Sequence, residues 1–406
     1  MTPNTPPTIP PDRADGGSSF VHFTLIVTGT LGRIAPLKLL PAWAALAAIA
    51  GWPWQALRLP AIGISAVFVI VDWAMLGLLP VKRRSWGPVT PPLLGLTLVR
   101  VVLMWAGAWI APTGIGLALV VILHILLSTT AIYATWIEPF RLGVTQQTYY
   151  LSHWGYRTTP LRVLHISDLH FEGQSPREDA LLAQVAALAP DFIVLTGDYL
   201  NLSSVYDPAA QAGARDLLAQ LDAPLGVYAI TGSPVVDIAG IVPEIFAGLD
   251  VHWLDDEAHT IQHDECRLHL LGVRTTYDEA RDAAALQRLM QAAPGNAFSL
   301  LLYHTPDLMP VAAQLGVQLY LCGHTHGGQL RLPFYGALAT SSRWGKKYEM
   351  GLYREGNTTL YVSRGLGMEG LGAPRARFLA PPEIIHWTLT RDQNVVSLKQ
   401  ELALVR

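Results

Sequence analysis

The chain has 406 residues, of which 51% are hydrophobic and 15% are charged, and its formal net charge is −3 at pH 7. With this balance and no basic stripe, nucleic acid is excluded as an expected partner. The apolar excess comes from the first third of the chain, which indicates a membrane region followed by a more polar one.

Residues 1–36 are predicted to form a disordered tail that ends in a short apolar segment. The first 19 residues are rich in Pro, Thr, Gly, Ser and Asp, a composition that cannot build a core. Phe20–Leu31 is apolar but too short to cross a bilayer alone.

Residues 37–139 are predicted to form an all-helical transmembrane domain of about four spans. Each of four apolar segments approaches the ~20 residues that a hydrocarbon core requires. They are Leu39–Leu57, Ala61–Leu79, Pro91–Ala111 and Ile115–Ile137. A buried helical bundle in a soluble protein is the alternative explanation of this pattern.

Basic residues flank these segments unevenly. With four spans, Arg33, Lys38, the basic residues at 82–84 and Arg141 all lie on the side of the C-terminal region, whereas the other side has only Arg58. The positive-inside rule then predicts that the C-terminal region is cytoplasmic.

Two charges fall inside the predicted spans. Asp72 and Arg100 would both lie roughly 12–14 Å from the cytoplasmic edge at a rise of about 1.5 Å per residue, so they could pair between neighbouring helices. Because an unpaired charge at this depth is unfavourable, we expect a structural ion pair rather than a substrate or lipid-headgroup role. His124 is expected to make a polar contact between helices.

Residues 140–406 are predicted to form one α/β domain. Val144–Leu151 reads as an edge strand that pairs with Leu161–Ile166. Amphipathic segments predict helices on the sheet faces. These segments are Arg177–Ala189, Ala209–Leu221, Val242–Leu249 and Asp278–Ala292.

Four short apolar strands of this domain end in residues that bind metals. The strands that begin at Arg162, Asp191, Phe298 and Val317 are followed by Asp168 and His170, by Asp198, by His304, and by His324 and His326. Ligand sites in open sheets form beyond the carboxyl ends of strands. Taken singly, each Asp could be a turn or cap residue and each His a core residue. Together they predict a site of nitrogen and oxygen ligands, suited to Mn, Fe or Zn.

These residues resemble, in their order along the chain, the motifs of the calcineurin-like metallophosphoesterases. The matching strings are Asp168-x-His170, Gly197-Asp198, His304 and Gly323-His324-Thr325-His326, and the resemblance runs from about Leu161 to the C-terminus. The strings Tyr361–Gly367 and Pro381–Ile384 are closest to the bacterial, membrane-attached branch of that family.

The resemblance implies a four-layer αββα sandwich that binds two divalent metal ions. Asp168, His170 and His326 would hold one ion, His304 and His324 the other, and Asp198 would bridge both. Asp198 and His304 would also be the catalytic residues. The implied chemistry is attack on phosphorus by a metal-bound hydroxide.

One motif departs from the family pattern. Where the family has Gly-Asn-His, this chain has Gly232-Ser233-Pro234. Ser233, in the place of the ligand Asn, is a poorer ligand, and Pro234 has no ionisable group. The second ion would therefore be bound more weakly. Asp237, three residues further on, is a candidate replacement ligand.

The predicted function is that of an integral membrane phosphoesterase of the bacterial inner membrane, with a cytoplasmic catalytic domain. Its substrate would be a phosphomonoester, phosphodiester or diphosphate, and lipid-linked molecules such as a UDP-diacylglucosamine are among the candidates. The alternative is a metal-binding membrane scaffold or sensor without turnover, which the Ser233-Pro234 replacement favours. Eight basic residues between Arg331 and Arg377 form either a solvated face or a site for phosphate or anionic headgroups.

Overall fold

A computed structural model of the chain describes residues 27–151 and 159–391. The predicted tail and most of the segment Phe20–Leu31 lie outside the described residues. The chain folds into two compact units. The first contains the helices before Phe140 together with Glu369–Phe378, and the second contains the described residues of 140–368 and 379–391.

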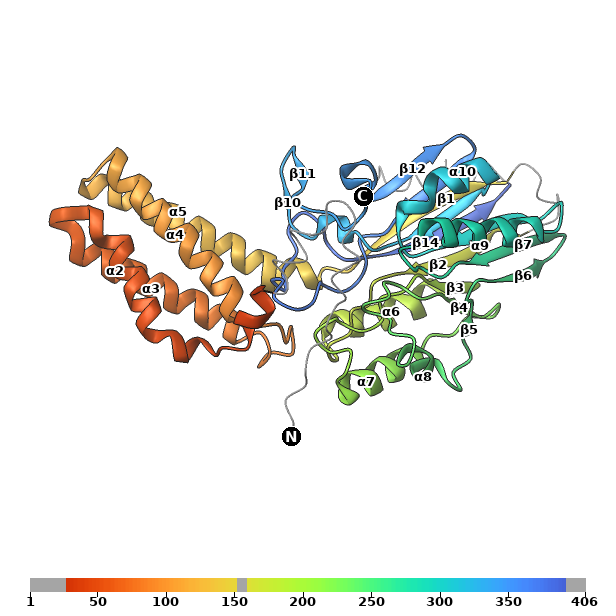
Figure 1. Cartoon of the computed structure of the whole chain (residues 1–406), viewed down its shortest axis with the longest axis horizontal. Helices are drawn as coiled ribbons and strands as arrows, with labels where there is room; N and C mark the ends of the chain where they lie inside the picture. Colours follow the sequence, from red (N-terminus) through yellow and green to blue (C-terminus); the bar gives the residue numbers. More distant parts are fainter. Residues whose placement is uncertain (1–26, 152–158, 392–406) are drawn as a thin grey trace. The chain divides into compact units, whose positions relative to one another are not determined.

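The first unit is a bundle of apolar helices, drawn in red to yellow in Figure 1. Its four α-helices pack against one another. They are α2 (Leu40–Gly51), α3 (Arg58–Gly77), α4 (Thr90–Ile110) and α5 (Gly114–Ile132). Short turns of 3-10 or π-helix adjoin them: η1 (Pro36–Leu39), η2 (Trp52–Leu57), η3 (Tyr133–Ile137) and η4 (Glu138–Phe140).

Three stretches of the described chain are long and apolar enough to cross a membrane: Pro36–Gly77, Thr90–Ile110 and Gly114–Phe140. The first predicted span, Leu39–Leu57, is not one helix. It consists of α2 and η2, and the chain bends at Gln55, where φ is 46°. Because α2 has 12 residues, its rise is about 18 Å, short of the ~30 Å hydrocarbon core.

The predicted pairing of the two charges in the bundle is confirmed. Arg100 on α4 donates two hydrogen bonds to Asp72 on α3, at 2.7 and 2.8 Å. Arg100 also donates to the Ser128 hydroxyl at 2.7 Å and to the His124 backbone carbonyl at 3.1 Å. The His124 ring packs edge-on against Phe68, so it contacts an aromatic ring rather than the polar group that the sequence predicted.

The second unit contains two six-stranded mixed sheets (Figure 1). The first has the order β1-β14-β2-β3-β4-β5 and the second has the order β12-β13-β9-β8-β7-β6. The strands of the first sheet are β1 (Gly143–Tyr150), β2 (Leu161–Ile166), β3 (Phe192–Leu195), β4 (Val227–Ala229), β5 (His252–Trp253) and β14 (Glu383–Thr390). The strands of the second are β6 (Glu257–His263), β7 (Cys266–Gly272), β8 (Phe298–Leu302), β9 (Leu319–Cys322), β12 (Gly351–Glu355) and β13 (Thr358–Val362).

The two sheets pack face to face, and helices cover their outer faces. Alternate residues of each strand point to opposite faces. On β7, Leu268 and Leu270 therefore join the core between the sheets, whereas Leu271 packs in the cluster under α9 (Glu279–Gln291) and α10 (Met309–Leu315). The helices α6 (Pro176–Leu188), α7 (Pro208–Leu218) and α8 (Val242–Phe246) follow strands of the first sheet. The predicted four-layer αββα sandwich is confirmed.

The four helices begin within one residue of their predicted starts, and α6, α7 and α9 follow good capping residues. Ser175 begins α6 with a capping box to Glu178, and Asp207 and Asp278 cap α7 and α9 with their side chains. The helices predicted at Ala209–Leu221 and Val242–Leu249 each end three residues earlier, at Leu218 and Phe246.

The predicted partner of the edge strand was wrong. β1 lies at the edge of its sheet, but it pairs in parallel with β14, and β14 pairs antiparallel with β2. A strand from the end of the chain is therefore inserted between two strands that are adjacent in the sequence.

Candidate metal centre

Five strands deliver the predicted ligands to one place in the two-sheet unit. Asp168 and His170 follow β2, Asp198 follows β3, and Ser233 follows β4. His304 follows β8, and His324 and His326 follow β9. In the first sheet β2, β3 and β4 are parallel to one another, and in the second sheet β8 and β9 are parallel. Their carboxyl ends therefore meet at one edge of the sandwich.

The backbone at these strand ends is strained in a consistent way. Asp168, His170, Asp198, His324 and His326 all have positive φ, between 41° and 71°. Non-glycine residues adopt this left-handed conformation rarely, at about 1 kcal/mol or more each. Strain of this kind persists where it turns side chains toward a common centre.

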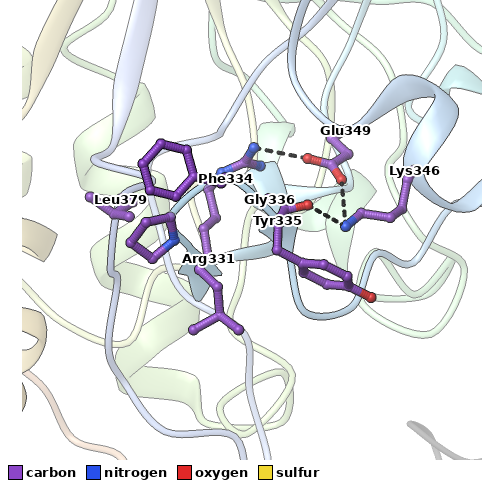
Figure 2. A pocket seen from close by; sticks show the side chains of 9 residues that line it. Arg331, Phe334, Tyr335, Gly336, Lys346, Glu349 and Leu379 are labelled. Carbon is purple, nitrogen blue, oxygen red and sulfur yellow. Dashed lines mark hydrogen bonds and ion pairs between the residues drawn. The ribbon is translucent and has the colours of Figure 1, made fainter.

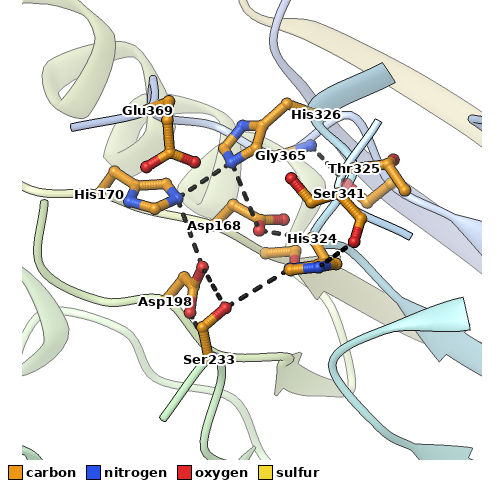
Figure 3. Close-up of polar contacts among 12 residues, drawn as sticks. Asp168, His170, Asp198, Ser233, His324, Thr325, His326, Ser341, Gly365 and Glu369 are labelled. Atoms are coloured by element: carbon orange, nitrogen blue, oxygen red, sulfur yellow. Dashed lines mark hydrogen bonds and ion pairs between the residues drawn. The ribbon is translucent and has the colours of Figure 1, made fainter. Parts of the chain in front are cut away.

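The first group of candidate ligands consists of Asp168, His170 and His326, all of them buried. The Nε2 atoms of the two histidines lie 3.0 Å apart, and Nε2 of His326 lies 3.8 Å from Oδ1 of Asp168. Figure 3 shows the three side chains facing one another. Asp168 Oδ1 accepts a hydrogen bond from the backbone N–H of His324 at 2.9 Å.

The second group consists of Asp198, His304 and His324. Nε2 of His304 lies 3.3 Å from Oδ2 of Asp198, and Nε2 of His170 lies 3.5 Å from the same oxygen. The carboxylate of Asp198 therefore lies between the two groups. Both groups have the composition that the family resemblance implies.

Ser233 lies inside the second group. Its Oγ is 3.2 Å from Asp198 Oδ2, 3.1 Å from His304 Nε2 and 3.4 Å from His324 Nδ1. Its backbone N–H also donates to Asp198 Oδ1 at 2.6 Å. The hydroxyl thus points to the place where the family's Asn side chain would act.

The donor atoms fit divalent metal ions. Asp168 Oδ2 is buried without a hydrogen-bond partner among the described residues, which is unfavourable unless a cation compensates it. His304 Nδ1 lies 2.7 Å from the carbonyl oxygen of Thr196, and donation to that oxygen leaves Nε2 free to bind a metal. Imidazole and carboxylate ligands without thiolates suit Zn, Fe or Mn.

In the second group, neighbouring charges shift the pKa values of both histidines in opposite directions. Although burial acts in the opposite direction, the carboxylates of Asp198 and Asp168 raise the pKa of His304 to about 10. Burial and the neighbouring charge of His304 lower the pKa of His324 to about 4. Because metal ligands must be deprotonated, an ion that binds this group has to displace the proton of His304.

Asp237 is not placed as a ligand. Its carboxylate accepts hydrogen bonds from the backbone N–H groups of Asp198 at 2.8 Å, Gly232 at 2.7 Å and Tyr199 at 3.0 Å. Both oxygens are therefore used to hold the loops after β3 and β4 together. The structure does not support the alternative in which Asp237 replaces the family's Asn, because both carboxylate oxygens accept backbone hydrogen bonds that sequence spacing does not reveal.

Glycine at position 323 lets the loop after β9 approach Asp168 closely. A Cβ atom at this position would collide with Asp168 Oδ2 and Ser167 Oγ. We expect Gly323→Ala to displace the Asp168 carboxylate, to lower metal content and to destabilise the fold by about 1–3 kcal/mol. Metal analysis and thermal unfolding would measure both effects. Gly295→Ala is the matched control, because a Cβ atom there would meet nothing within 4 Å, and similar losses in both variants would contradict the expectation.

His165 on β2 gives the fold a predicted dependence on pH. Burial lowers the pKa of His165 to about 3, and its Nε2 lies 2.8 Å from the hydroxyl oxygen of Thr196. In the unfolded chain this histidine is protonated below about pH 6.5, whereas in the folded chain it stays neutral down to about pH 3. The free energy of unfolding therefore falls as the pH drops from 6.5 toward the lowered pKa. The slope is about 1.4 kcal/mol per pH unit. With a chelator present to remove metal ions, His165→Gln should lose this part of the pH dependence of the unfolding free energy. Identical slopes of unfolding free energy against pH in the wild type and the variant would contradict the expectation.

The basic residues between Arg331 and Arg377 are divided between the two units. Several form ion pairs with acidic residues: Arg331 and Lys346 with Glu349, Arg343 with Glu279, Lys347 with Glu355, and Arg364 with Glu383. Arg375 and Arg377 belong to the helical unit. The eight residues therefore do not act as one cluster.

The comparisons with known proteins agree with this geometry. A family model described as calcineurin-like phosphoesterase matches residues 161–238. The uncharacterized metallophosphoesterase YkuE of Bacillus subtilis is 32% identical over 269 residues, which cover 63% of this chain and 88% of that protein. Phosphodiesterase YaeI of Escherichia coli is 28% identical over 213 residues, 51% of this chain and 76% of that protein. The UDP-2,3-diacylglucosamine pyrophosphatase LpxG of Chlamydia trachomatis is 27% identical over 309 residues, 63% of this chain and 91% of that protein.

The chain thus combines a four-layer sandwich with two groups of candidate metal ligands at its strand ends. The chain belongs to the calcineurin-like phosphoesterase family, as the order of its motifs predicted. It is accordingly a hydrolase of phosphoric esters from a family that binds divalent metals.

Proposed function

We propose that this protein hydrolyses a diphosphate bond in a lipid-linked substrate at the cytoplasmic face of the bacterial inner membrane. The observation that carries the proposal is the loop after β4. Each candidate metal group keeps its three Asp and His side chains, but in this loop Pro234 replaces the residue that would protonate a poor leaving group.

Leaving-group chemistry distinguishes the possible substrates. Hydrolysis of an alkyl phosphomonoester expels an alkoxide, which needs a proton from a general acid as the bond breaks. Hydrolysis of a diphosphate expels a phosphate, a much weaker base that can leave without this help. Pro234 has neither an ionisable side chain nor a backbone N–H. The loop after β4 therefore favours a diphosphate, or a diester with an acidic leaving group.

The remaining side chains have positioning roles in this proposal. Bound divalent ions would supply a Lewis acid that lowers the pKa of water and stabilises charge on the phosphoryl oxygens. Asp168, His170 and His326 would hold one ion, and His304 and His324 the other. The backbone N–H of Ser233 fixes the orientation of the Asp198 carboxylate between them.

The apolar helices support a membrane-bound substrate. A catalytic unit that continues directly from the stretch Gly114–Phe140 would work close to the headgroups if that stretch crosses the bilayer. The relative LpxG is named for action on UDP-2,3-diacylglucosamine, a diphosphate with a lipid portion. The excess of basic residues on one side of the helices supports the cytoplasmic orientation.

A series of aryl phosphodiesters that differ in the pKa of their phenol leaving groups would test whether the enzyme lacks a general acid. The manganese-loaded protein should show rates that fall steeply as the phenol becomes more basic. A Ser233→Asn, Pro234→His variant should flatten this dependence and raise the rates of the poorest leaving groups by about 10²–10⁴-fold. Pro294→His, in the loop after α9, is the matched control. Equal slopes in wild type and variant would contradict the proposal.

A scaffold or sensor without turnover is the second candidate, and the same Ser233-Pro234 replacement favours it. Metal uptake with no hydrolysis of any ester or diphosphate above an Asp198→Asn control would establish it. Hydrolysis of a UDP-diacylglucosamine in bilayers, at a higher kcat/KM than a lipid-free nucleoside diphosphate ester, would support the enzyme and the lipid-linked substrate.

A further inference from the structure

The two-sheet unit has an exposed apolar hairpin outside the metal centre. Its strands are β10 (Arg331–Leu332) and β11 (Gly336–Ala337). Phe334 at the tip is fully exposed, and Tyr335, Leu338 and Leu332 expose 60%, 55% and 48% of their surface. Single exposed apolar residues are ordinary, but four within seven positions mark an interaction surface.

The hairpin is held in place rather than loose. Phe334 has a φ of 64°, a left-handed conformation that is unfavourable for an aromatic residue and persists where the surrounding structure holds it. Arg331 donates to the carbonyl oxygen of Gly327 at 2.7 Å and pairs with Glu349 at 2.9 Å. The backbone N–H of Ala337 donates to the same carboxylate at 3.3 Å.

Basic residues surround the apolar tip. The ammonium group of Lys346 lies 3.3 Å from the centre of the Tyr335 ring and donates to the Tyr335 carbonyl. Arg331, Tyr335, Lys346 and Leu379 line a hollow of about 500 Å³ (Figure 2). Between Arg331 and Glu355 the chain has five basic and two acidic residues, and Glu279 adds a third acidic group through its ion pair with Arg343. Together these side chains carry a net charge of +2. Aromatic residues with lysine and arginine around them are typical of surfaces that bind anionic lipid headgroups.

The hairpin is coupled to the metal centre through the loop after β9. Gly327, whose carbonyl accepts from Arg331, directly follows the candidate ligand His326. A surface that binds the hairpin would therefore also orient this loop.

We propose that the β10–β11 hairpin binds the headgroup layer of an anionic bilayer, with Phe334 and Tyr335 inserted among the headgroups and Arg343, Lys346 and Lys347 against the lipid phosphates. The side chains of these three basic residues are each about half exposed. The apolar helices on the same chain would keep the hairpin at a high local concentration near a membrane, so a modest affinity would suffice. The proposal does not depend on the reaction that the metal centre performs.

The test uses the full chain in lipid nanodiscs and requires no turnover. In a Cys266→Ser background, where Cys322 is fully buried, Phe334→Cys would be labelled with an environment-sensitive dye. Discs containing phosphatidylglycerol and spin-labelled lipid should quench the dye strongly. Lys346→Gln and Lys347→Gln should each lower the ratio of bound to free hairpin by roughly fivefold at low salt. Circular dichroism would show that each variant folds.

The matched control is a dye at Leu352→Cys on β12, where the native side chain is 54% exposed. This dye should remain accessible to water in all discs. The proposal is overturned if the dye at position 334 is quenched no more than this control. It is also overturned if quenching is as strong in phosphatidylcholine discs, or if shielding of the dye requires two protein molecules in one disc, which would identify a second copy as the partner.

Discussion

Replacing Asp198 by Asn should lower hydrolysis of bis-p-nitrophenyl phosphate by about 10³-fold or more in the manganese-loaded protein. The carboxylate lies between the two candidate groups, 3.3 Å from His304 Nε2 and 3.5 Å from His170 Nε2. An amide removes the negative charge that two neighbouring cations would need. Metal content should therefore fall from about two ions per chain to one or fewer, and turnover should fall with it.

Asp222→Asn is the control for this experiment, because it makes the same chemical change at an exposed position after α7. Turnover and metal content of this variant should equal those of the wild type. Full metal content in Asp198→Asn, with a loss of activity below tenfold, would show that Asp198 does not bridge the ions.

The site was the part most readily predicted from the sequence, because its residues follow strands directly. A buried apolar run followed by Asp168 or His324 identifies a strand, and it shows that the ligand lies at the carboxyl end of that strand. Two local features of the sequence, the length of the apolar run and the type of the residue after it, were therefore sufficient to predict that six side chains from distant segments share one site. In the structure all six lie in two groups of three.

Contacts between distant segments could not be predicted in this way. The insertion of β14 between β1 and β2 depends on backbone pairing over more than 200 residues, and no local pattern encodes it. Asp237 was a candidate replacement ligand because its residue type and position allowed it. Its backbone donors come largely from the loop after β3, which the spacing of residues after β4 does not reveal.

The first apolar helix shows the same limit at short range. Hydropathy continues through Trp52-Pro53-Trp54, so a window of about 20 residues reads Leu39–Leu57 as one span. Backbone geometry decides differently, because α2 ends at Gly51 and Gln55 adopts a positive φ. Hydropathy indicates whether a segment is apolar enough to lie in lipid. The length of its helix depends on where the backbone turns.

The ion pair inside the helical unit should have a large effect on stability. Asp72→Asn would leave the Arg100 guanidinium buried beside a neutral amide. We expect the unfolding free energy to fall by about 3–5 kcal/mol, since one charge of a buried pair then lacks compensation. Arg100 is only 2% exposed and Asp72 is fully buried, so water cannot replace the lost partner. Denaturation of the protein in mixed lipid and detergent micelles would measure the change.

A double variant distinguishes the interaction between Asp72 and Arg100 from the contribution of each residue alone. Asp72→Leu with Arg100→Leu removes both charges and should be less destabilised than either single variant, because two apolar side chains leave no charge uncompensated. Thr97→Val on the same helix is the control, since the Thr97 hydroxyl donates within α4 to the Leu93 carbonyl. Its loss should cost about 1 kcal/mol at most. Strictly additive effects of the two charge replacements would show that Asp72 and Arg100 do not stabilise the bundle through each other.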